Sequence, residues 1–348
     1  MNILLGKTLS ELTALATSLG LPSYVGKQLA QWLYVQRVRS FDEMTNLSKS
    51  ARALLSTTCT IGRHAPVTSA TSSDGTIKYL FEIPTTLPFE GRAGDGSFIE
   101  SVYIPDSDRA TLCVSTQAGC KMGCRFCMTG TLGFHGHLPA SEILNQIFEV
   151  DGINSLTNLV YMGEGEPMDN LDAVLTSLEI MTADYGPAWS PKRITVSSVG
   201  LIPELERFLT QTQCHLAISL HNPFHEQRLA IMPIEQRYPL TDILTFLRQF
   251  DFAHQRRLSF EYICWAGVND TPRHAKELVR LLGNIPCRVN LIRFHEGVNQ
   301  PLPASDEQQM VRLRDYLTAH GVTTTIRRSR GEDILAACGM LVNALKNE

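Results

Sequence analysis

The sequence lacks the features that would place the protein in a membrane or among secreted disulfide proteins. No run of about 18 apolar residues occurs in its 348 residues, so a transmembrane helix is not expected. The first residues, MNILLGKTLSELTAL, contain no small-residue cleavage site of the secretory type. Nine unevenly spaced cysteines do not read as a disulfide framework for a chain of this size. We therefore expect a cytoplasmic protein with reduced thiols and no membrane association.

The sequence also lacks an excess of basic residues. Lys and Arg number 31 against 35 Asp and Glu, which gives a net charge of −4. General nucleic-acid binding usually needs a basic balance, so contact with RNA would have to come from local clusters. The candidate clusters are Lys192 with Arg193, Arg256 with Arg257, and Arg327 with Arg328 and Arg330.

The composition and the local patterns indicate a packed α/β protein of two parts. Hydrophobic residues make up 43% of the chain and charged residues 19%, and no internal repeat or low-complexity tract occurs. Residues 26 to 60 have helical periodicity with Ser40 or Asp42 placed to cap, and Asp74-Gly75 predicts a hairpin between short antiparallel strands. We divide the chain into an accessory domain, 1–105, which would bind RNA, and a larger domain, 106–348, joined by a linker near Pro105.

In the larger part, apolar β-branched runs alternate with helical stretches from Thr111 onward. Such alternation predicts right-handed βαβ units and a parallel sheet. The predicted strands are 111–116, 158–163, 192–198, 214–221, 258–264 and 287–294, and the predicted helices are 140–150, 170–183, 203–211, 240–250 and 272–283. Six units predict a partial (β/α)6 TIM-like barrel with a small N-terminal helical/β domain. A doubly wound open sheet is the alternative.

Three closely spaced cysteines, Cys120, Cys124 and Cys127, form a C-x3-C-x2-C motif after the first predicted barrel strand. Thiolates are the ligands of iron–sulfur clusters, and three of them leave one iron of a four-iron cluster for another ligand. The alternative is a zinc knuckle that takes its fourth ligand from Cys113, His135 or His137.

Other strand ends carry polar groups, as expected for a site at the carboxyl edge of a barrel. These segments are GEGEP, VSSVG, SLHNP and RFHEG. Near the end of the chain, Cys338 follows an arginine cluster, which favours a reactive thiolate, and Cys113 is a candidate redox partner. The remaining cysteines, assigned structural roles, are Cys59, Cys214, Cys264 and Cys287.

These motifs together resemble a known family. C-x3-C-x2-C with Phe126 before the last cysteine resembles the radical S-adenosylmethionine (SAM) superfamily. SSDGTIK, CVSTQAGCKMGCRFC, the G-x-G-E-P turn, SLH and RGEDILAACGM recur in the same order over nearly the whole chain of the RlmN family. The resemblance implies methylation of carbon 2 of adenine in 23S ribosomal RNA and beside the anticodon of transfer RNA. It also implies a [4Fe-4S] cluster, two SAM molecules per turnover, and an electron donor such as flavodoxin or ferredoxin.

The resemblance also implies the roles of individual residues. Cys120, Cys124 and Cys127 would bind the cluster, and Cys338 would receive a methyl group from the first SAM. A 5′-deoxyadenosyl radical from the second SAM would then take hydrogen from that methyl group, and the methylene radical would add to carbon 2. Glu100 would remove the proton from carbon 2, and Cys113 would release the product by forming a disulfide. The residues implied to bind SAM are Gly165, Glu166, Ser197, Ser219, Leu220, His221 and His295.

Two positions depart from the family pattern. His295 stands where many relatives have an asparagine, and Glu164 in GEGEP replaces the methionine of GMGEP and would add a charge beside the cofactor. Three other functions are compatible with parts of the sequence: a related methyltransferase of carbon 8 of adenine, the Cfr type; an activating enzyme that forms a glycyl radical on a protein; and a zinc-stabilised, non-catalytic RNA-binding protein.

Overall fold

The structure, a computed structural model, describes all residues except 85–97, 132, 255, 296–301, 337–339 and 342–348. Its centre is a ten-stranded sheet in the order β14-β13-β12-β11-β10-β9-β6-β5-β4-β3. In this sheet, neighbouring strands from β14 through to β6 pair in parallel. The strands β6, β5, β4 and β3 pair antiparallel with one another in turn. Strand bounds are β3 Thr68–Thr71, β4 Ile77–Glu82, β5 Phe98–Pro105, β6 Ala110–Cys113, β9 Asn158–Tyr161, β10 Ile194–Ser198, β11 His215–Ser219, β12 Leu258–Cys264, β13 Cys287–Arg293 and β14 Thr323–Ile326.

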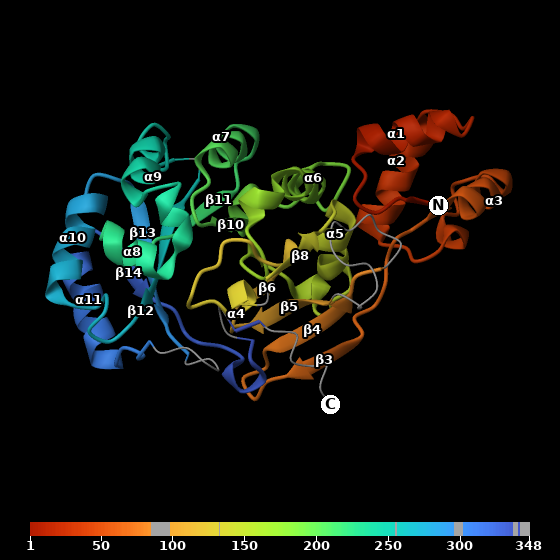
Figure 1. The fold of residues 1–348 in the computed structure, drawn as a ribbon. Coiled ribbons are helices and arrows are strands. Elements are labelled where there is room, and N and C mark those ends of the chain that lie inside the picture. Colours follow the sequence, from red (N-terminus) through yellow and green to blue (C-terminus); the bar gives the residue numbers. More distant parts are fainter. Residues whose placement is uncertain (85–97, 132, 255, 296–301, 337–339, 342–348) are drawn as a thin grey trace.

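Helices connect the parallel strands and cover the outer face of the curved sheet (Figure 1). Strand β12 is buried at every position because helices cover one of its faces and the barrel interior lies on the other. Prolines begin α10 and lie in the first turn of α7, where the absent N–H costs no helical hydrogen bond. The helix bounds are α4 Met128–Thr131, α5 Ala140–Phe148, α6 Leu171–Thr182, α7 Ile202–Gln211, α8 His225–Ile231, α9 Leu240–Leu247, α10 Pro272–Leu282 and α11 Glu307–Ala319.

This architecture confirms the predicted α/β fold with a partial barrel. All six predicted barrel strands are present, but three of them end two or three residues earlier than predicted. Strand β6 ends three residues early, at Cys113, and β9 and β11 each end two residues early, at Tyr161 and Ser219. The sequence analysis did not identify α8, α11 or β14. The last of these is formed by the polar segment TTTI, whose threonines give little hydrophobic alternation.

The amino-terminal helices lie together at one end of the molecule (Figure 1). They are α1 Leu9–Ser18, α2 Tyr24–Ala30 and α3 Lys49–Thr58, and the short strands β1 Asn2–Ile3 and β2 Cys59–Thr60 pair beside them. Ser40 begins the helical turn at 41–43, and its N–H donates to Glu43 at 2.8 Å, so the predicted cap is present. No described helix is long and apolar enough to cross a membrane.

The segment around Pro105 is a tight turn between β5 and β6 in which the Asp106 N–H donates to the Arg109 carbonyl. Because β5 pairs with β6, the antiparallel strands extend the barrel sheet, and Val102 lies opposite Cys113. The division at residues 105 and 106 stays a prediction. The predicted hairpin is present: β3 and β4 pair antiparallel, and Gly75 in the turn has φ of +83°, which favours glycine.

Candidate active site

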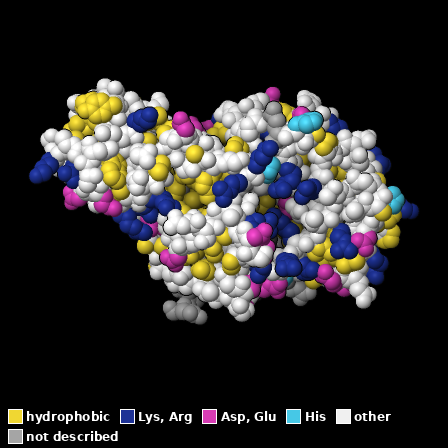
Figure 2. All heavy atoms as spheres, turned by 180° about the vertical axis from the view of Figure 1, so that it is seen from behind, with side chains coloured by type: hydrophobic (Ala, Val, Ile, Leu, Met, Phe, Trp, Pro, Cys, Tyr) yellow, Lys and Arg dark blue, Asp and Glu magenta, His cyan; other side chains and the backbone are white. Residues whose placement is uncertain are grey.

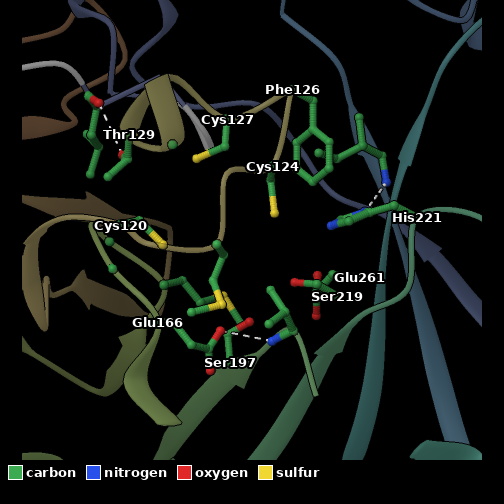
Figure 3. A pocket seen from close by; sticks show the side chains of 18 of the residues that line it. Cys120, Cys124, Phe126, Cys127, Thr129, Glu166, Ser197, Ser219, His221 and Glu261 are labelled. Carbon is green, nitrogen blue, oxygen red and sulfur yellow. Dashed lines mark hydrogen bonds between the residues drawn. The ribbon is translucent and has the colours of Figure 1, made fainter. Parts of the chain in front are cut away.

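The three cysteines of the motif lie in one loop, between β7 (Gln117–Gly119) and α4, and line one pocket (Figure 3). Gly119 leads into this loop with φ of +70°, and a Cβ atom there would lie 1.8 Å from the Gly133 carbonyl oxygen. Gly133 precedes β8 (Phe134–His137), the partner strand of β7. The β7–β8 hairpin and its glycine therefore fix where the loop leaves the sheet.

The chemistry of this loop fits an iron–sulfur cluster. Burial raises the pKa of Cys120 to about 12 and the pKa of Cys124 well above its usual value, so these thiols keep their protons until a metal replaces them. Among the described residues, no three His, Cys, Asp or Glu side chains converge as ligands of a single ion. A four-iron cluster does not require such convergence, because each thiolate binds a different iron atom.

The turn after β9 forms another wall of the pocket and contains Gly165 and Glu166. The Glu166 carboxylate is buried and accepts a hydrogen bond from the N–H of Val199 at 2.9 Å (Figure 3). It also accepts one from the N–H of Met168 at 3.1 Å. Burial raises the pKa of Glu166 to about 7, although these hydrogen bonds oppose the shift. Gly165 has φ of +95°, and a Cβ atom would lie 2.5 Å from the Gln117 side chain. Only glycine fits there.

The ends of β10 and β11 complete the pocket with Ser197, Ser219 and His221. The Ile263 N–H donates to Nδ1 of His221 at 3.1 Å, so Nε2 is the protonated nitrogen of the neutral ring. Figure 3 shows the other ring nitrogen directed toward the pocket. Burial and the charge of Arg228 lower the pKa of His221 to about 3. His221 therefore offers the pocket a neutral hydrogen-bond donor over the physiological pH range.

Aromatic rings hold His221 and the cysteine loop together. The ring of Phe126, next to Cys127, lies edge-on to the His221 ring with 4.7 Å between their centroids. The centroids of Phe126 and Trp265 are 5.3 Å apart. The guanidinium of Arg228 holds the end of β11 by donating to the carbonyls of Ser219 at 2.8 Å and Leu220 at 3.0 Å. The aromatic residue of the motif thus has a packing role in orienting the site.

The sequence analysis did not name Glu261 and assigned Arg327 only to a cluster for RNA contact, although both residues line this pocket. Glu261 in β12 is buried and accepts from Asn290 at 2.8 Å and Ser259 at 3.1 Å, and Arg327 lies 3.7 Å from its second oxygen. Both Glu261 and Arg327 line the pocket. The available signal was a carboxylate inside the otherwise apolar strand LSFEYIC, which indicates an inward-facing polar position.

The other predicted site residues lie nearby but not in this pocket. Leu220 is buried, and its N–H donates to the Glu261 carbonyl at 3.0 Å. His295 lines an adjoining cavity, where its Nε2 lies 2.7 Å from the Ser329 hydroxyl. Cys113 lines the same cavity, and Glu100 in β5 pairs with Lys78 at 3.1 Å. Cys338 lies outside the described residues.

Glu164, expected beside the cofactor, points its carboxylate elsewhere. It accepts hydrogen bonds from the N–H groups of Glu100 at 2.9 Å and Gly119 at 3.4 Å. Burial and the charge of Glu100 raise the pKa of Glu164 to about 8. The side chain therefore links β5 to the start of the cysteine loop.

The adjoining cavity is strongly basic. It shares Met162, Ile292, Arg327 and Leu341 with the cysteine pocket, so the two spaces meet. On the face seen in Figure 2, Lys and Arg side chains gather around a hollow near the middle of the molecule. An acidic residue, Asp106, also lines the cavity. The described arginines that line the cavity are Arg109, Arg257, Arg288, Arg293, Arg327, Arg328 and Arg330.

The other predicted basic residues have structural contacts. Arg193 donates to the Thr157 carbonyl at 2.6 Å, and Arg256 donates to the Leu209 carbonyl at 2.8 Å. Arg257, the neighbour of Arg256, lines the basic cavity. Lys192, the neighbour of Arg193, lies in the short helical turn before β10. Of the three predicted clusters, 327–330 contributes most to the cavity.

Comparison with known proteins agrees with this geometry. Residues 1–61 match the model of the ribosomal RNA large subunit methyltransferase N-terminal domain, and residues 114–282 match the radical SAM superfamily. A crystal structure of a radical SAM methyltransferase from Sphaerobacter thermophilus superimposes with a TM-score of 0.88 at 36% identity. That match covers 98% of this chain and 99% of the other.

Curated relatives match over nearly the full length. A probable dual-specificity RNA methyltransferase RlmN from Phocaeicola vulgatus is 55% identical, covering 98% of this chain and 95% of the relative. A dual-specificity RNA methyltransferase RlmN from Anaeromyxobacter dehalogenans is 40% identical, covering 95% of this chain and 89% of the relative. The cysteine loop, the G-x-G-E-P turn and the sequence matches lead to one conclusion: the chain belongs to the RlmN family of radical SAM RNA methyltransferases.

Proposed function

We propose that this enzyme methylates carbon 2 of adenine in ribosomal and transfer RNA, using Cys338 as methyl carrier and Cys113 as resolving thiol. The observation that carries the proposal is the packing on either side of Cys338. Ala336 and Leu341 form one buried apolar cluster with Val102, and Cys113 packs against it. Leu341 also lines the three-cysteine pocket, and its carbonyl accepts from the Thr129 hydroxyl at 3.2 Å. Two described residues on either side of Cys338, Ala336 and Leu341, thus border the cavity that Cys113 lines, and Leu341 borders the cysteine pocket as well.

The residues of the pocket are suited to hold the cofactors. Cys120, Cys124 and Cys127 would bind a [4Fe-4S] cluster, while Glu166, His221 and the two serines would bind SAM. When bound, the cluster and two SAM molecules per turnover supply the methyl group and a 5′-deoxyadenosyl radical. The chain's own task is then to orient the nucleotide and exclude water. The buried ring of Phe126 and the closely packed backbone at Gly165 serve that task.

Two further residues complete the proposed chemistry at the RNA. Glu100 would remove the proton from carbon 2 of the adenine, and the Cys113 thiolate would attack Sγ of Cys338. Before this step the adduct would have to give up its unpaired electron, for which the cluster would be the acceptor. The new S–S bond would form as the bond between Cys338 and the transferred carbon breaks. The electron pair of that bond would stay with the carbon, which takes up a proton to become the methyl group, and the methylated RNA is released. Leu341 borders both the cysteine pocket and the cavity that Cys113 lines, so methyl transfer and release would take place in adjoining spaces.

The basic cavity supports RNA as the substrate. The chain is acidic overall, yet seven of the described arginines line the cavity that contains Cys113 and adjoins the cysteine pocket. Phosphate contacts by Arg and Lys supply a large part of the affinity of nucleic-acid-binding proteins, and a base must leave its stack to react at carbon 2. The cavity would hold the phosphates on either side of the extruded adenine. We further propose that the enzyme acts in the cytoplasm and receives electrons from a flavodoxin or ferredoxin.

The test is mass spectrometry of the anaerobically purified Cys113→Ala protein, supplied with SAM, reductant and RNA. We expect an adenine nucleotide attached to Cys338, because the adduct forms but is not resolved. The matched control is the double variant Cys113→Ala/Cys338→Ala, which should carry no adduct. Digested RNA from the wild-type reaction should contain 2-methyladenosine. An unmodified Cys338 in protein that carries its cluster, or methylation at carbon 8, would overturn the proposal.

A further inference from the structure

The turn between β3 and β4 contacts a segment near the other end of the chain. The Ser72 hydroxyl donates to Oδ1 of Asp333 at 2.6 Å, and the Ser73 N–H donates to Oδ2 at 3.0 Å. In the reverse direction, the Gly331 N–H donates to Oδ2 of Asp74 at 3.1 Å. Two sequence motifs, SSDGT and RGEDI, therefore bind each other across about 260 residues of chain.

These contacts are reciprocal and geometrically demanding. Each aspartate accepts from the opposite segment, so sliding one segment past the other breaks both sets of hydrogen bonds. Gly331 has φ of +64°, and a Cβ atom there would lie 2.9 Å from Cγ2 of Thr76 and 2.8 Å from Cβ of Ala336. A glycine is required for the two segments to approach this closely.

Charge reinforces the contact. Arg330 lies 3.9 Å from Asp74 and 3.4 Å from Asp106, so the segment is held against both the β3–β4 turn and the β5–β6 turn. Burial alone would raise the pKa of Asp74, but hydrogen bonds from Thr76, Gly331 and Ser72 lower it to about 2. Asp74 is therefore ionised at every pH at which the protein works.

Further along, the segment lies over residues with proposed chemical roles. The Lys78 ammonium donates to the Leu335 carbonyl at 3.4 Å and also pairs with Glu100. Ile334 and Ala336 pack in the cluster that contains Val102 and is contacted by Cys113. The β3–β4 turn thus binds residues 331 and 333, directly before the apolar residues that pack near Cys113.

We propose that Asp74 and Asp333 are positioning residues that dock segment 330–336 on the β3–β4 turn and so hold the approach to Cys338 beside Cys113. This inference rests on the proposed function for its catalytic meaning, because Cys338 must meet Cys113 after each methyl transfer. The docking itself is a property of described residues. A docked segment restricts the positions that the following residues can reach and raises the effective concentration of one thiol at the other.

Hydrogen exchange on the intact, cluster-containing protein tests the docking directly. Asp333→Ala removes the acceptor for Ser72 and Ser73 and leaves the β3–β4 turn intact. We expect the amides of Gly331, Leu335 and Ala336 to exchange about tenfold faster, since local opening sets their exchange rate. Asp315→Ala, an exposed aspartate on α11, is the matched control and should exchange as the wild type does. Unchanged exchange in Asp333→Ala would overturn the docking.

Disulfide formation tests the consequence for the two thiols. Diamide oxidises two thiols to a disulfide by taking up two electrons and two protons. With this reagent, the disulfide between Cys113 and Cys338 should form about tenfold more slowly in Asp333→Ala than in the wild type or in Asp315→Ala. Asp333→Asn, which keeps one acceptor oxygen, should restore part of the rate, and the cluster absorbance should not change. Equal rates in all four proteins would overturn the positioning role. A wild-type enzyme that methylates no RNA would instead refute the proposed function, while exchange and disulfide rates would still report on the docking.

Discussion

The carboxylate of Glu164 accepts a hydrogen bond from the backbone N–H of Glu100 at 2.9 Å, although 64 residues separate them in the chain. The same carboxylate accepts from Gly119, directly before Cys120. Glu164 therefore connects the strand of the proposed base to the loop of the proposed cluster.

This connection makes stability depend on pH. The folded-state pKa of Glu164 is about 8 and lies above the usual value of 4.5, so the folded protein binds a proton that the unfolded chain has released. The free energy of unfolding should therefore fall as pH rises from about 5 to about 8. Glu164→Gln should make this slope shallower, as measured by denaturant unfolding of anaerobic protein at several pH values. Exposed Glu226→Gln is the control, and an equal slope in both variants would contradict the prediction.

Removal of Lys78 should destabilise the protein strongly. Lys78 and Glu100 form a fully buried ion pair at 3.1 Å, and Lys78→Met removes the positive charge from this pair. We expect a loss of roughly 3–5 kcal/mol in the free energy of unfolding. The double variant Lys78→Met/Glu100→Gln should recover most of that loss, because it removes both charges of the buried pair. A double variant as unstable as the single one would show that packing, not charge, sets the cost.

Replacement of Cys124 by alanine should remove the cluster. Iron content should fall from about four atoms per chain to less than one. The absorbance at about 400 nm, which arises from thiolate-to-iron charge transfer, should disappear with the iron. RNA methylation should be lost in parallel. Cys287→Ala, a cysteine on β13 outside the pocket, is the control and should keep both iron and colour. Full iron content in Cys124→Ala would remove this residue from the ligand set.

SAM binding through His221 should not depend on the charge state of this ring. The pKa of His221 is about 3, so the side chain stays neutral from about pH 5 to 8 and its contribution to affinity should be constant there. His221→Ala should weaken SAM binding by about tenfold, measured by calorimetry on cluster-containing protein. The exposed residue His254, replaced by Ala, is the control. A His221-dependent rise in affinity on acidification would contradict the neutral-donor role.

The arginines of the basic cavity should determine how RNA binding responds to salt. Arg257→Ala and Arg288→Ala should each lower RNA affinity by several-fold and reduce the slope of log K against log salt concentration by about 1. The measurement is a filter-binding titration at several salt concentrations. Arg280→Ala, an exposed arginine on α10 outside the cavity, should change neither quantity. An unchanged slope in the cavity variants would place the RNA elsewhere.

Several parts of the molecule could be predicted from the sequence because they depend on local patterns. The spacing of Cys120, Cys124 and Cys127 allows a single loop to carry them, and short apolar runs predict the six barrel strands. Strand β14 escaped prediction because TTTI obtains its place from pairing with β13 and not from its own hydrophobicity. Glu261 escaped as a site residue although its carboxylate lies within an apolar strand, because the sequence does not show that this strand lines the same pocket as the cysteine loop.

The sequence by itself determined the cysteine motif and the alternation of strands and helices, since each depends on residues close together in the chain. It also determined the family, since the order of such local motifs along the chain carries the resemblance. Only the tertiary structure decided which distant residues meet. Ser72 reaches Asp333, Glu164 reaches Glu100, and Arg257 lines the same cavity as Arg327. The physical reason is that such contacts depend on how the sheet curves and which strands pair. Composition and spacing report on burial and local conformation, whereas the curvature of the open sheet brings together charges that the linear sequence keeps apart.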